Sequence, residues 1–417
     1  RDPEMSRGLG DVYKRQPLNC WLMKRVICSF FIALSICMVT SCSDDFEYNS
    51  VEEVSVDNDD SLIDLYSALL DNLSSQTRGI NSEYPDFYGG AYLDGSCLVV
   101  QIKEGVYDIP SFIQDNDNIK IKYCRYSLNE LNAIMNKLNK IFIYEKNILN
   151  PVGSNIGLYS VSQKNNCVEV YLKKCTAYEI KLFKEMVLES SAIQFKQHVD
   201  DNEIVDWDDV FIRFPLNRTK YSVYPGANIA YVEDGGKTPR GYSSAGYKAK
   251  YNNKIGFVTA GHGITTKDVG ALVKTTEAFV VGKCVFQYHS DSIDVAFFEV
   301  NSSSEVTHKI LNGSNIISSE IAQLKDLPEN SKVYFAGSRS QGEGVIKSLN
   351  TTNPAGGITN LVSASYNSKK GDSGGLVYIV KNGKNVIAGI HNGKSDGIPC
   401  FVKALSIENA VSITSCD

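Results

Sequence analysis

The sequence predicts two successive folded regions, an α+β region over residues 61–220 and an all-β domain over residues 221–417. In the first region, helix-capping residues precede apolar residues at helical spacing, and two alternating apolar and polar stretches flank a polar turn. In the second, glycine becomes frequent, helical periodicity disappears, and short apolar stretches alternate with turns such as residues 234–236 and 381–384. Many short strands joined by glycine-rich turns are typical of a barrel or a sandwich.

Two helices of the α+β region are predicted from their first residues. Ser127 and Glu130 have the spacing of a capping box, and so do Thr176 and Glu179. Each pair precedes apolar residues three and four positions apart, as in a helix that packs one face against a core. We therefore expect one helix after Ser127 and another after Thr176.

Strands are expected around the second helix. Residues 156–161 and 168–172 alternate apolar and polar side chains around a turn at residues 164–166, which predicts a hairpin. Residues 192–195 are expected to form a strand after the helix. The order strand, turn, strand, helix, strand predicts a small α+β module.

The N-terminal part of the chain carries targeting features. Residues 1–22 show no amphipathic period and are interpreted as upstream or vector-derived sequence. Residues 23–41 combine basic residues with an apolar run too short to span a bilayer, which is the layout of a signal peptide. The run ends in a pattern that resembles a lipobox, so we expect Cys42 to be lipidated and residues 42–60 to form an acidic tether.

This pattern predicts an exported lipoprotein of the outer membrane or cell surface. An ordinary signal peptide followed by a chance cysteine would have the same layout. A periplasmic or secreted protein is therefore the alternative.

Composition limits the function classes. The 417 residues carry a formal net charge of −6 without a long Lys/Arg block, which argues against nucleic-acid binding. Of eleven cysteines, the seven after Cys42 are scattered without a C-x-x-C pair, so a zinc site is not expected. We expect neither a metal nor an organic cofactor.

Three short sequences in the all-β domain carry residues of catalytic type. They are FVTAGH, which ends in His262, SIDVAFF, which contains Asp294, and KGDSGGLV, which contains Ser373. Taken singly, they fit a loop histidine, a strand-edge carboxylate and a tight turn. Their order, with spacings of 32 and 79 residues, is the His, Asp, Ser order of chymotrypsin.

These residue types suit acyl transfer. A serine hydroxyl becomes a good nucleophile when a base such as His262 accepts its proton, and a carboxylate such as Asp294 holds the imidazole in one tautomer. The glycines beside Ser373 leave the backbone amides of Gly371 and Ser373 able to stabilise an oxyanion. Asp372 is expected to support the loop rather than to react.

The motifs TAGH, at residues 259–262, and GDSGG, at residues 371–375, resemble those of the chymotrypsin superfamily, most closely its streptogrisin and α-lytic protease branch. Residues 337–345 resemble the first hairpin of the second barrel in that branch. The resemblance covers residues 221–417 and implies two six-stranded antiparallel barrels with the site between them. It implies a serine endopeptidase acting through an acyl-enzyme on Ser373, with protein or peptide substrates.

The same branch makes its enzymes as zymogens with a pro-region. Residues 156–195 are similar in element order to the C-terminal module of such pro-regions, so residues 61–220 are interpreted as an intramolecular pro-region. Cleavage would then fall between Leu216 and Gly226. A substrate-binding or partner-binding domain is the alternative.

Specificity residues are also suggested by the resemblance. Asn367 occupies the position where trypsin-like enzymes carry Asp, which argues against cleavage after Lys or Arg. Residues 388–394 resemble the Gly-Ile-His segment of glutamyl endopeptidases, in which the histidine contacts a substrate carboxylate. A preference for Glu or Asp is therefore expected, since lysines would add positive charge nearby. The expected substrate-binding residues are His391, Lys370, Asn392, Gly393 and Lys394.

Some features leave other interpretations open. His391 also fits a core histidine, and His198, His289 and His308 lie in no motif. The cysteine that usually follows the active-site histidine in the family is replaced by Gly263, so the family's disulfides are not expected. The alternative functions are a catalytically silent binding protein with a protease fold, or an adhesion or ligand module formed by residues 61–220.

Overall fold

The computed structural model describes residues 57–77, 83–105, 108–146, 152–198, 221–236, 238–274 and 277–417. The predicted signal peptide, the lipidation site Cys42 and residues 216–220 of the expected cleavage segment lie outside these residues. Among the described residues, no helix combines the length and the apolar character needed to cross a bilayer.

The first barrel is formed by one continuous antiparallel sheet that closes on itself. Its strands are β8 (Asn228–Glu233), β9 (Gly241–Ser244), β10 (Lys248–Tyr251), β11 (Lys254–Thr259), β12 (Asp268–Lys274), β13 (Glu277–Ser290) and β14 (Ile293–Val300). β9 pairs with β8 and β10 pairs with β11, so these two short strands act as halves of one bent strand that closes the barrel. The barrel therefore has six strand positions.

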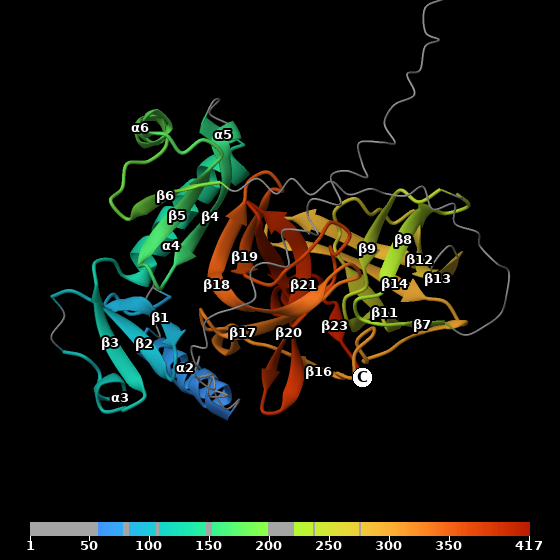
Figure 1. The fold of residues 1–417 in the computed structure, drawn as a ribbon, viewed down its shortest axis with the longest axis horizontal. Helices are drawn as coiled ribbons and strands as arrows, with labels where there is room; N and C mark the ends of the chain where they lie inside the picture. Colours follow the sequence, from blue (N-terminus) through green and yellow to red (C-terminus); the bar gives the residue numbers. More distant parts are fainter. Residues whose placement is uncertain are drawn as a thin grey trace, which may run out of the picture. The chain divides into compact units, whose positions relative to one another are not determined.

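The second barrel closes in the same manner. Its strands are β17 (Lys332–Ala336), β18 (Gln341–Asn353), β19 (Ile358–Ala364), β20 (Leu376–Lys381), β21 (Lys384–Ser395) and β22 (Ile398–Lys403). They follow the order β17-β20-β21-β22-β19-β18, and β18 pairs again with β17. The expected pair of six-stranded antiparallel barrels is confirmed (Figure 1).

Shorter elements surround the barrels. They are β7 (Tyr221–Val223), β15 (Ser304–Val306), β16 (Ile317–Ile321), the 3-10 helix η2 (Leu324–Asp326), α7 (Ala404–Val411) and β23 (Thr414–Ser415). The expectation that helical periodicity ends after residue 222 is wrong at α7. Ala404 and Ile407 of this helix are buried against the strands. Two buried apolar residues in a helix of eight form too short a periodic pattern to predict a helix from the sequence.

The N-terminal region contains a separate three-stranded sheet, three further strands that extend the sheet of the second barrel, and several helices. Its elements are α2 (Asp57–Gln76), β1 (Tyr88–Asp94), β2 (Cys97–Lys103), α3 (Ser111–Gln114), β3 (Ile119–Cys124), α4 (Leu128–Asn139), the π-helix η1 (Lys140–Tyr144), α5 (Val152–Asn155), β4 (Ile156–Ser162), β5 (Cys167–Leu172), α6 (Ala177–Met186) and β6 (Ile193–Gln197). The predicted hairpin, second helix and following strand are confirmed as β4, β5, α6 and β6.

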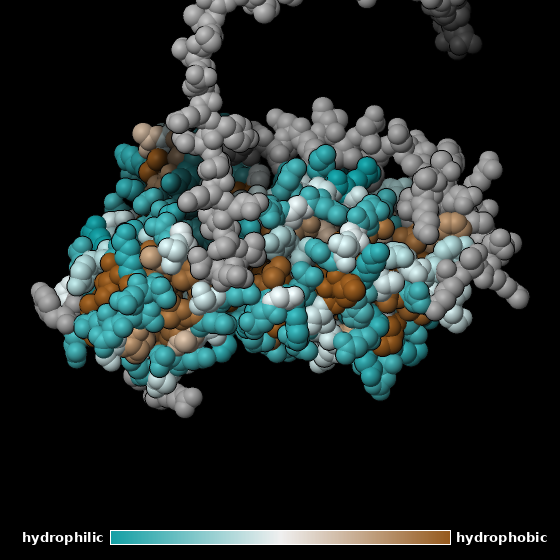
Figure 2. Space-filling view, turned by 60° about the horizontal axis from the view of Figure 1, so that its bottom comes forward, coloured by the Kyte–Doolittle hydropathy of each residue, from teal (hydrophilic) through white to brown (hydrophobic). Residues whose placement is uncertain are grey.

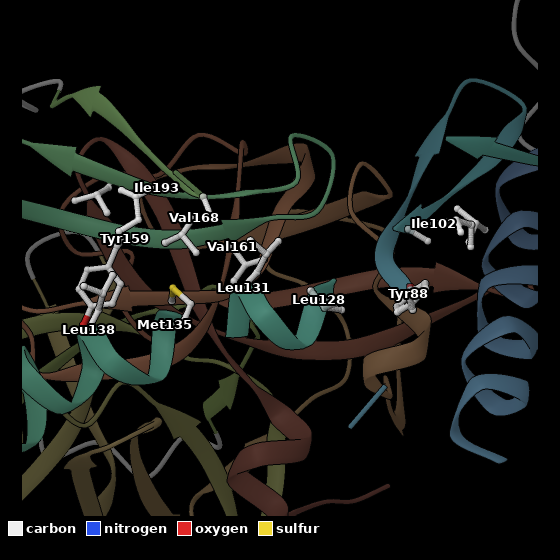
Figure 3. Packing of buried hydrophobic residues seen from close by; sticks show 14 of the residues in the cluster. Tyr88, Ile102, Leu128, Leu131, Met135, Leu138, Tyr159, Val161, Val168 and Ile193 are labelled. Carbon is white, nitrogen blue, oxygen red and sulfur yellow. The ribbon is translucent and has the colours of Figure 1, made fainter. Parts of the chain in front are cut away.

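The two predicted helix starts are confirmed in detail. The Ser127 side chain accepts from the Glu130 amide, and the Glu130 carboxylate accepts from the Ser127 amide, which completes the capping box. Thr176 accepts from the Glu179 amide. The buried face of α4 packs on the β4–β5 hairpin through Leu131, Met135, Leu138 and their strand neighbours (Figure 3). Local sequence and core packing therefore agree here.

One boundary prediction is wrong. Residues 57–60 were expected to end the acidic tether, but they form the first turn of α2. The buried residues Leu62, Tyr66, Leu69 and Leu73 follow helical spacing and seat α2 in the core of the N-terminal region. This periodicity determines the helix despite its acidic start.

The sheet of the N-terminal region continues into the second barrel. β4 pairs antiparallel with β18, with Ser160 opposite Thr351 and Tyr159 opposite Thr352 (Figure 1). Backbone pairing at a strand edge thus joins the two regions.

On the face shown in Figure 2, hydrophobic residues form separate patches among hydrophilic ones.

Candidate active site

His262 and Asp294 are held together by adjacent strands of the first barrel. β11 and β14 pair with Thr259 opposite Ala296, so the turn that follows β11 lies beside the start of β14. The Asp294 carboxylate accepts from His262 Nδ1 at 2.7 Å and from the backbone amide of His262 at 2.7 Å. The ring and the backbone of one residue are therefore anchored to one carboxylate.

The Asp294 carboxylate lies in a cluster of N–H donors. It is fully buried, and besides His262 it accepts from the Gly261 amide at 2.8 Å, His289 Nδ1 at 2.9 Å and Asn392 Nδ2 at 2.7 Å. Burial would raise its pKa, but the hydrogen bonds from His262 and His289 hold the pKa of Asp294 well below its usual value. Asp294 is therefore a carboxylate at neutral pH.

Sequence reasoning missed both His289 and the contact of Asn392. His289 lies directly opposite Asp294 in the β13–β14 hairpin, whose turn contains Asp291 at φ +56°. A two-residue turn with this spacing was a usable signal, because it pairs the residues on either side in register. Asn392 belongs to the second barrel, so no local signal could have placed it beside Asp294.

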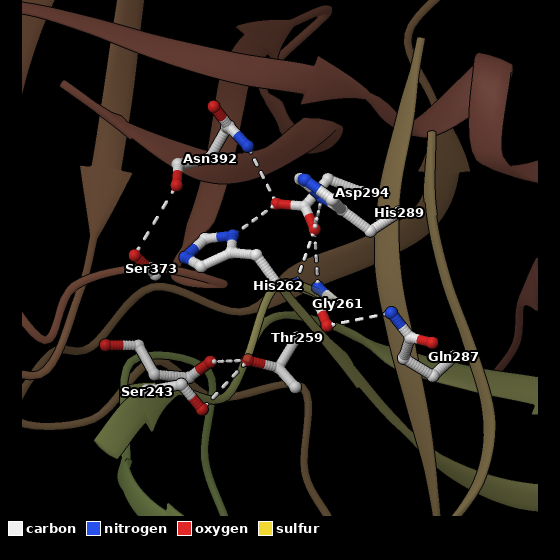
Figure 4. A network of polar contacts seen from close by, with 10 residues as sticks. Ser243, Thr259, Gly261, His262, Gln287, His289, Asp294, Ser373 and Asn392 are labelled. Atoms are coloured by element: carbon white, nitrogen blue, oxygen red, sulfur yellow. Dashed lines mark hydrogen bonds and ion pairs between the residues drawn. The ribbon is translucent and has the colours of Figure 1, made fainter. Parts of the chain in front are cut away.

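Ser373 lies in the loop between β19 and β20, where glycines determine the backbone path. Gly371 and Gly374 have φ angles of +99° and +84°, which favour glycine, and a side chain at Gly374 would clash with Thr259. The Ser373 hydroxyl donates to the Asn392 carbonyl at 3.4 Å. Figure 4 shows the His262 ring between Asp294 and Ser373, with the nitrogen opposite Nδ1 facing Ser373 and no bond drawn between them.

The backbone around Ser373 is fixed through its carbonyl groups. Ser244 donates its amide to the Ser373 carbonyl at 2.7 Å and its hydroxyl to the Gly371 carbonyl at 3.0 Å. Ser338 adds a hydroxyl donor to the Gly371 carbonyl at 3.2 Å. No described residue accepts a hydrogen bond from the amide of Gly371 or of Ser373, the two groups expected to bind an oxyanion.

Asp372 is buried and supports the loop. It accepts from the amides of Arg339 at 2.6 Å, Ser340 at 3.2 Å and Lys369 at 2.8 Å, and from the Ser340 hydroxyl. These partners come from the 337–340 turn and from its own loop. Its carboxylate is therefore already satisfied in the described structure.

The expected specificity residues lie in different surroundings. His391 is only 1% exposed, and its Nδ1 lies 2.9 Å from the Tyr366 hydroxyl. Burial, with the nearby His262 and Lys394, lowers the pKa of His391 to about 3, so its ring is neutral at neutral pH. Lys394 lines a cavity of about 610 Å³ together with Tyr366.

The other three expected specificity residues differ in exposure. Lys370 is exposed beside Gly371, and Gly393 is partly exposed with φ +153°. Asn392 contacts Asp294 and Ser373 rather than a side pocket. The five residues expected to bind substrate thus lie in different surroundings: a buried ring, a cavity wall, exposed or partly exposed surface, and the Asp294 cluster.

His262, His289 and Asp294 are residue types that can bind a metal ion. Their potential ligand atoms lie within 4.8 Å of one another. Two ligands of a tetrahedral zinc ion would stand about 3.3 Å apart, whereas the imidazole nitrogens lie 2.7 and 2.9 Å from the Asp294 oxygens. These are hydrogen-bond distances, so we interpret the group as a hydrogen-bonded cluster and not as metal ligands.

Another buried carboxylate lies where the N-terminal region meets the second barrel. Glu329 is 1% exposed and accepts from the amides of Gln163 at 3.0 Å and Lys164 at 3.1 Å, in the β4–β5 turn. Its carbonyl accepts from the Leu93 amide at 2.9 Å. Burial raises the pKa of Glu329 from 4.5 to about 8, although the two amides oppose the shift.

Comparison with known proteins gives the following similarities. Residues 129–198 match the family described as Pro-like C-terminal domain. This match includes the segment whose element order suggested a pro-module. No curated protein matches the chain.

Solved structures of chymotrypsin-like proteases are similar to the chain at low identity. Protease A of Thermobifida fusca is 19% identical with a TM-score of 0.35, over 46% of this chain and 97% of that one. Cellulomonas bogoriensis chymotrypsin is 22% identical with a TM-score of 0.37, over 47% and 99%. A glutamic acid-specific serine protease, described as using a histidine triad in substrate binding, is 21% identical with a TM-score of 0.38, over 46% and 100%.

Proposed function

We propose that the chain is a serine endopeptidase with Ser373 as nucleophile, His262 as general base and Asp294 as the carboxylate that orients His262. The observation that carries this proposal is the His262 ring, bonded through Nδ1 to a buried carboxylate at 2.7 Å while its other nitrogen faces Ser373 (Figure 4). The Ser373 hydroxyl, which now donates to the Asn392 carbonyl, would have to rotate to donate to that nitrogen. Such contacts tighten when substrate binds.

The chemistry follows from these positions. His262 takes the Ser373 proton as the oxygen attacks the peptide carbonyl, and then donates it to the leaving amine, which leaves an acyl-enzyme. Water hydrolyses the acyl-enzyme with His262 again acting as base. The developing oxyanion is stabilised by the amides of Gly371 and Ser373, and one such donor contributes about 10²–10³ in kcat.

Peptide hydrolysis tests this proposal. The chain, after limited proteolysis, is incubated with denatured casein alongside Ser373→Ala and the control Ser302→Ala, which changes an exposed serine in the turn after β14. We expect cleavage by the wild type and by the control and none by Ser373→Ala. Cleavage that persists in Ser373→Ala, or is absent from all three, would contradict the proposal.

We also propose that residues 61–220 act as a pro-region that inhibits the site until it is removed. The pairing of β4 with β18, the Glu329 contacts with Gln163 and Lys164, and the Pro-like match of residues 129–198 support this role. A cleavage site for a specific protease, placed between residues 199 and 220, allows a direct test. Peptidase activity should rise after the cut, and equal activity before and after would reject the inhibitory role.

A preference for Glu or Asp before the scissile bond is proposed for the same site. Lys394, which lines the cavity beside Tyr366, and the exposed Lys370 would supply positive charge. His391 enters as a neutral hydrogen-bonding ring, because its pKa is lowered to about 3. Peptides that differ only as Glu, Gln, Lys or Phe test the preference, and equal kcat/KM for Glu and Gln would remove it.

The lipid anchor at Cys42 is proposed from sequence alone. Cys42→Ala should release the protein from membranes, and sequencing of the mature N-terminus should fail when the amine is acylated. An unmodified N-terminus would instead indicate a periplasmic or secreted protein.

A further inference from the structure

His289 is a second imidazole bonded to the carboxylate that orients His262. Its Nδ1 lies 2.9 Å from Asp294 Oδ1, while His262 Nδ1 lies 2.7 Å from Asp294 Oδ2. The two rings are edge to face, with centroids 6.0 Å apart. One buried carboxylate is therefore shared between two imidazoles, each on its own oxygen (Figure 4).

The position of His289 is fixed by the fold. It pairs with Asp294 across the β13–β14 hairpin, so the two side chains emerge on the same face of adjacent strands. The turn is held from outside, since the Asp291 carbonyl accepts from the Thr359 amide at 2.7 Å. A well-packed hairpin thus presents this imidazole to Asp294.

We propose that His289 is a positioning residue of the peptidase site, which holds the Asp294 carboxylate and sets the pH range in which His262 can accept a proton. This inference rests on the proposed function only where it concerns the pH dependence of peptide hydrolysis. The shared carboxylate itself is a feature of the structure.

The charge on His289 determines the direction in which its loss should shift the pH dependence of activity. The hydrogen bond with Asp294 raises the pKa of His289, against a lowering by burial, and the backbone of Gly356 contributes a further increase. The ionisable groups facing His289 are Asp294 on β14 and His262 in the turn after β11. A protonated His289 neutralises part of the Asp294 charge and repels a second proton on His262. Loss of His289 should therefore leave the full Asp294 charge acting on the His262 ring, and the acid limb of the pH–activity profile should move to higher pH.

The test compares His289→Gln, His289→Leu and Tyr288→Phe in the processed chain. Gln is neutral and can still donate to Asp294, Leu cannot donate, and Tyr288 is an exposed neighbour on the same strand. We expect the acid limb of kcat/KM to move up by about one pH unit in both His289 variants. The plateau value of kcat/KM should fall by less than about threefold in His289→Gln. It should fall further in His289→Leu, because Asp294 then has one hydrogen-bond donor fewer.

Two outcomes would overturn the proposal. One is an acid limb that does not move upward in His289→Gln, with or without a lower plateau, which would indicate a purely structural residue. The other is an equal shift in Tyr288→Phe. If the wild type hydrolyses no peptide, the proposed function fails, and NMR titration of the His262 ring in the wild type and in His289→Gln still tests the coupling.

Discussion

Asp294 and Glu329 are both buried carboxylates, one in the first barrel and one where the N-terminal region meets the second barrel, yet their ionisation is shifted in opposite directions. Burial raises the pKa of each. Asp294 is surrounded by N–H donors that include two imidazoles, and its pKa is lowered. Glu329 accepts from two backbone amides, and its pKa rises to about 8. The number and kind of donors, and not burial, thus separate the two sites.

The largest expected effect comes from removing the Asp294 charge. Asp294→Asn should lower kcat by about 10⁴, because the amide no longer fixes the His262 tautomer that can accept the Ser373 proton. Asp291→Asn, an exposed change in the adjacent turn, is the control and should stay within about threefold. Steady-state kinetics on the processed chain provide the measurement. A similar loss in both variants would mean that the hairpin has been disturbed.

The buried Glu329 should make stability depend on pH in the opposite direction from an ordinary carboxylate. Its pKa is raised from 4.5 to about 8, so its protonated form is favoured in the fold. Its contribution to the free energy of unfolding should be fully present below about pH 4.5 and lost as the pH rises to about 8, by at most about 1.4 kcal/mol per pH unit. Glu329→Gln, which is neutral at every pH, should flatten this dependence.

Urea unfolding of the uncut chain at pH 5, 6, 7 and 8 measures this difference. Glu299→Gln is the control, since that carboxylate is only partly buried and pairs with Lys254 at 2.7 Å. Parallel stability curves for the wild type and Glu329→Gln would show that Glu329 remains ionised across this range.

A smaller effect is expected when Asp294 loses one neutral donor. Asn392→Ala removes the hydrogen bond from Asn392 Nδ2, which is 2.7 Å long. Hydrogen bonds to charged groups contribute about 1.5–3 kcal/mol, so kcat/KM should fall by about tenfold to a hundredfold. Asn392→Ser keeps a hydroxyl donor on a shorter side chain, so its kcat/KM should lie between those of the wild type and Asn392→Ala. Unchanged activity in Asn392→Ala would show that His262 and His289 suffice to hold Asp294.

The sequence predicted much of the fold because its signals were local. Three signals each depend on neighbours within a few residues: capping at Ser127 and Thr176, the alternation in β4 and β5, and the short strands with glycine-rich turns after residue 221. The sheet β1-β2-β3 and helix α2 were missed, although the spacing of Leu62, Tyr66 and Leu69 indicated the helix. The two-residue turn at Gly95 and Ser96 was a usable signal for the antiparallel β1–β2 hairpin, whereas β2 and β3 pair in parallel and have no such turn between them.

The site was predictable to the same extent. His262, Asp294 and Ser373 were predicted from motifs, and the His262 ring lies between the Asp294 carboxylate and Ser373 (Figure 4). Ser244 bonds to the loop that contains Ser373, and Asn392 bonds to Asp294. Both residues lie far from their partners in the sequence, so only the folded structure reveals these contacts. The burial of His391 beside Phe335 and Tyr366 could not be predicted from its motif, because these contacts join distant parts of the second barrel.

The most direct test of the central claim is the reaction of the processed chain with a fluorophosphonate, followed by mass spectrometry of its peptides. We predict one adduct, on the peptide that contains Ser373, which is absent from Ser373→Ala and forms far more slowly in His262→Ala. No adduct on the wild type, or equally fast labelling of Ser373 without the His262 ring, would contradict the claim that His262 activates Ser373.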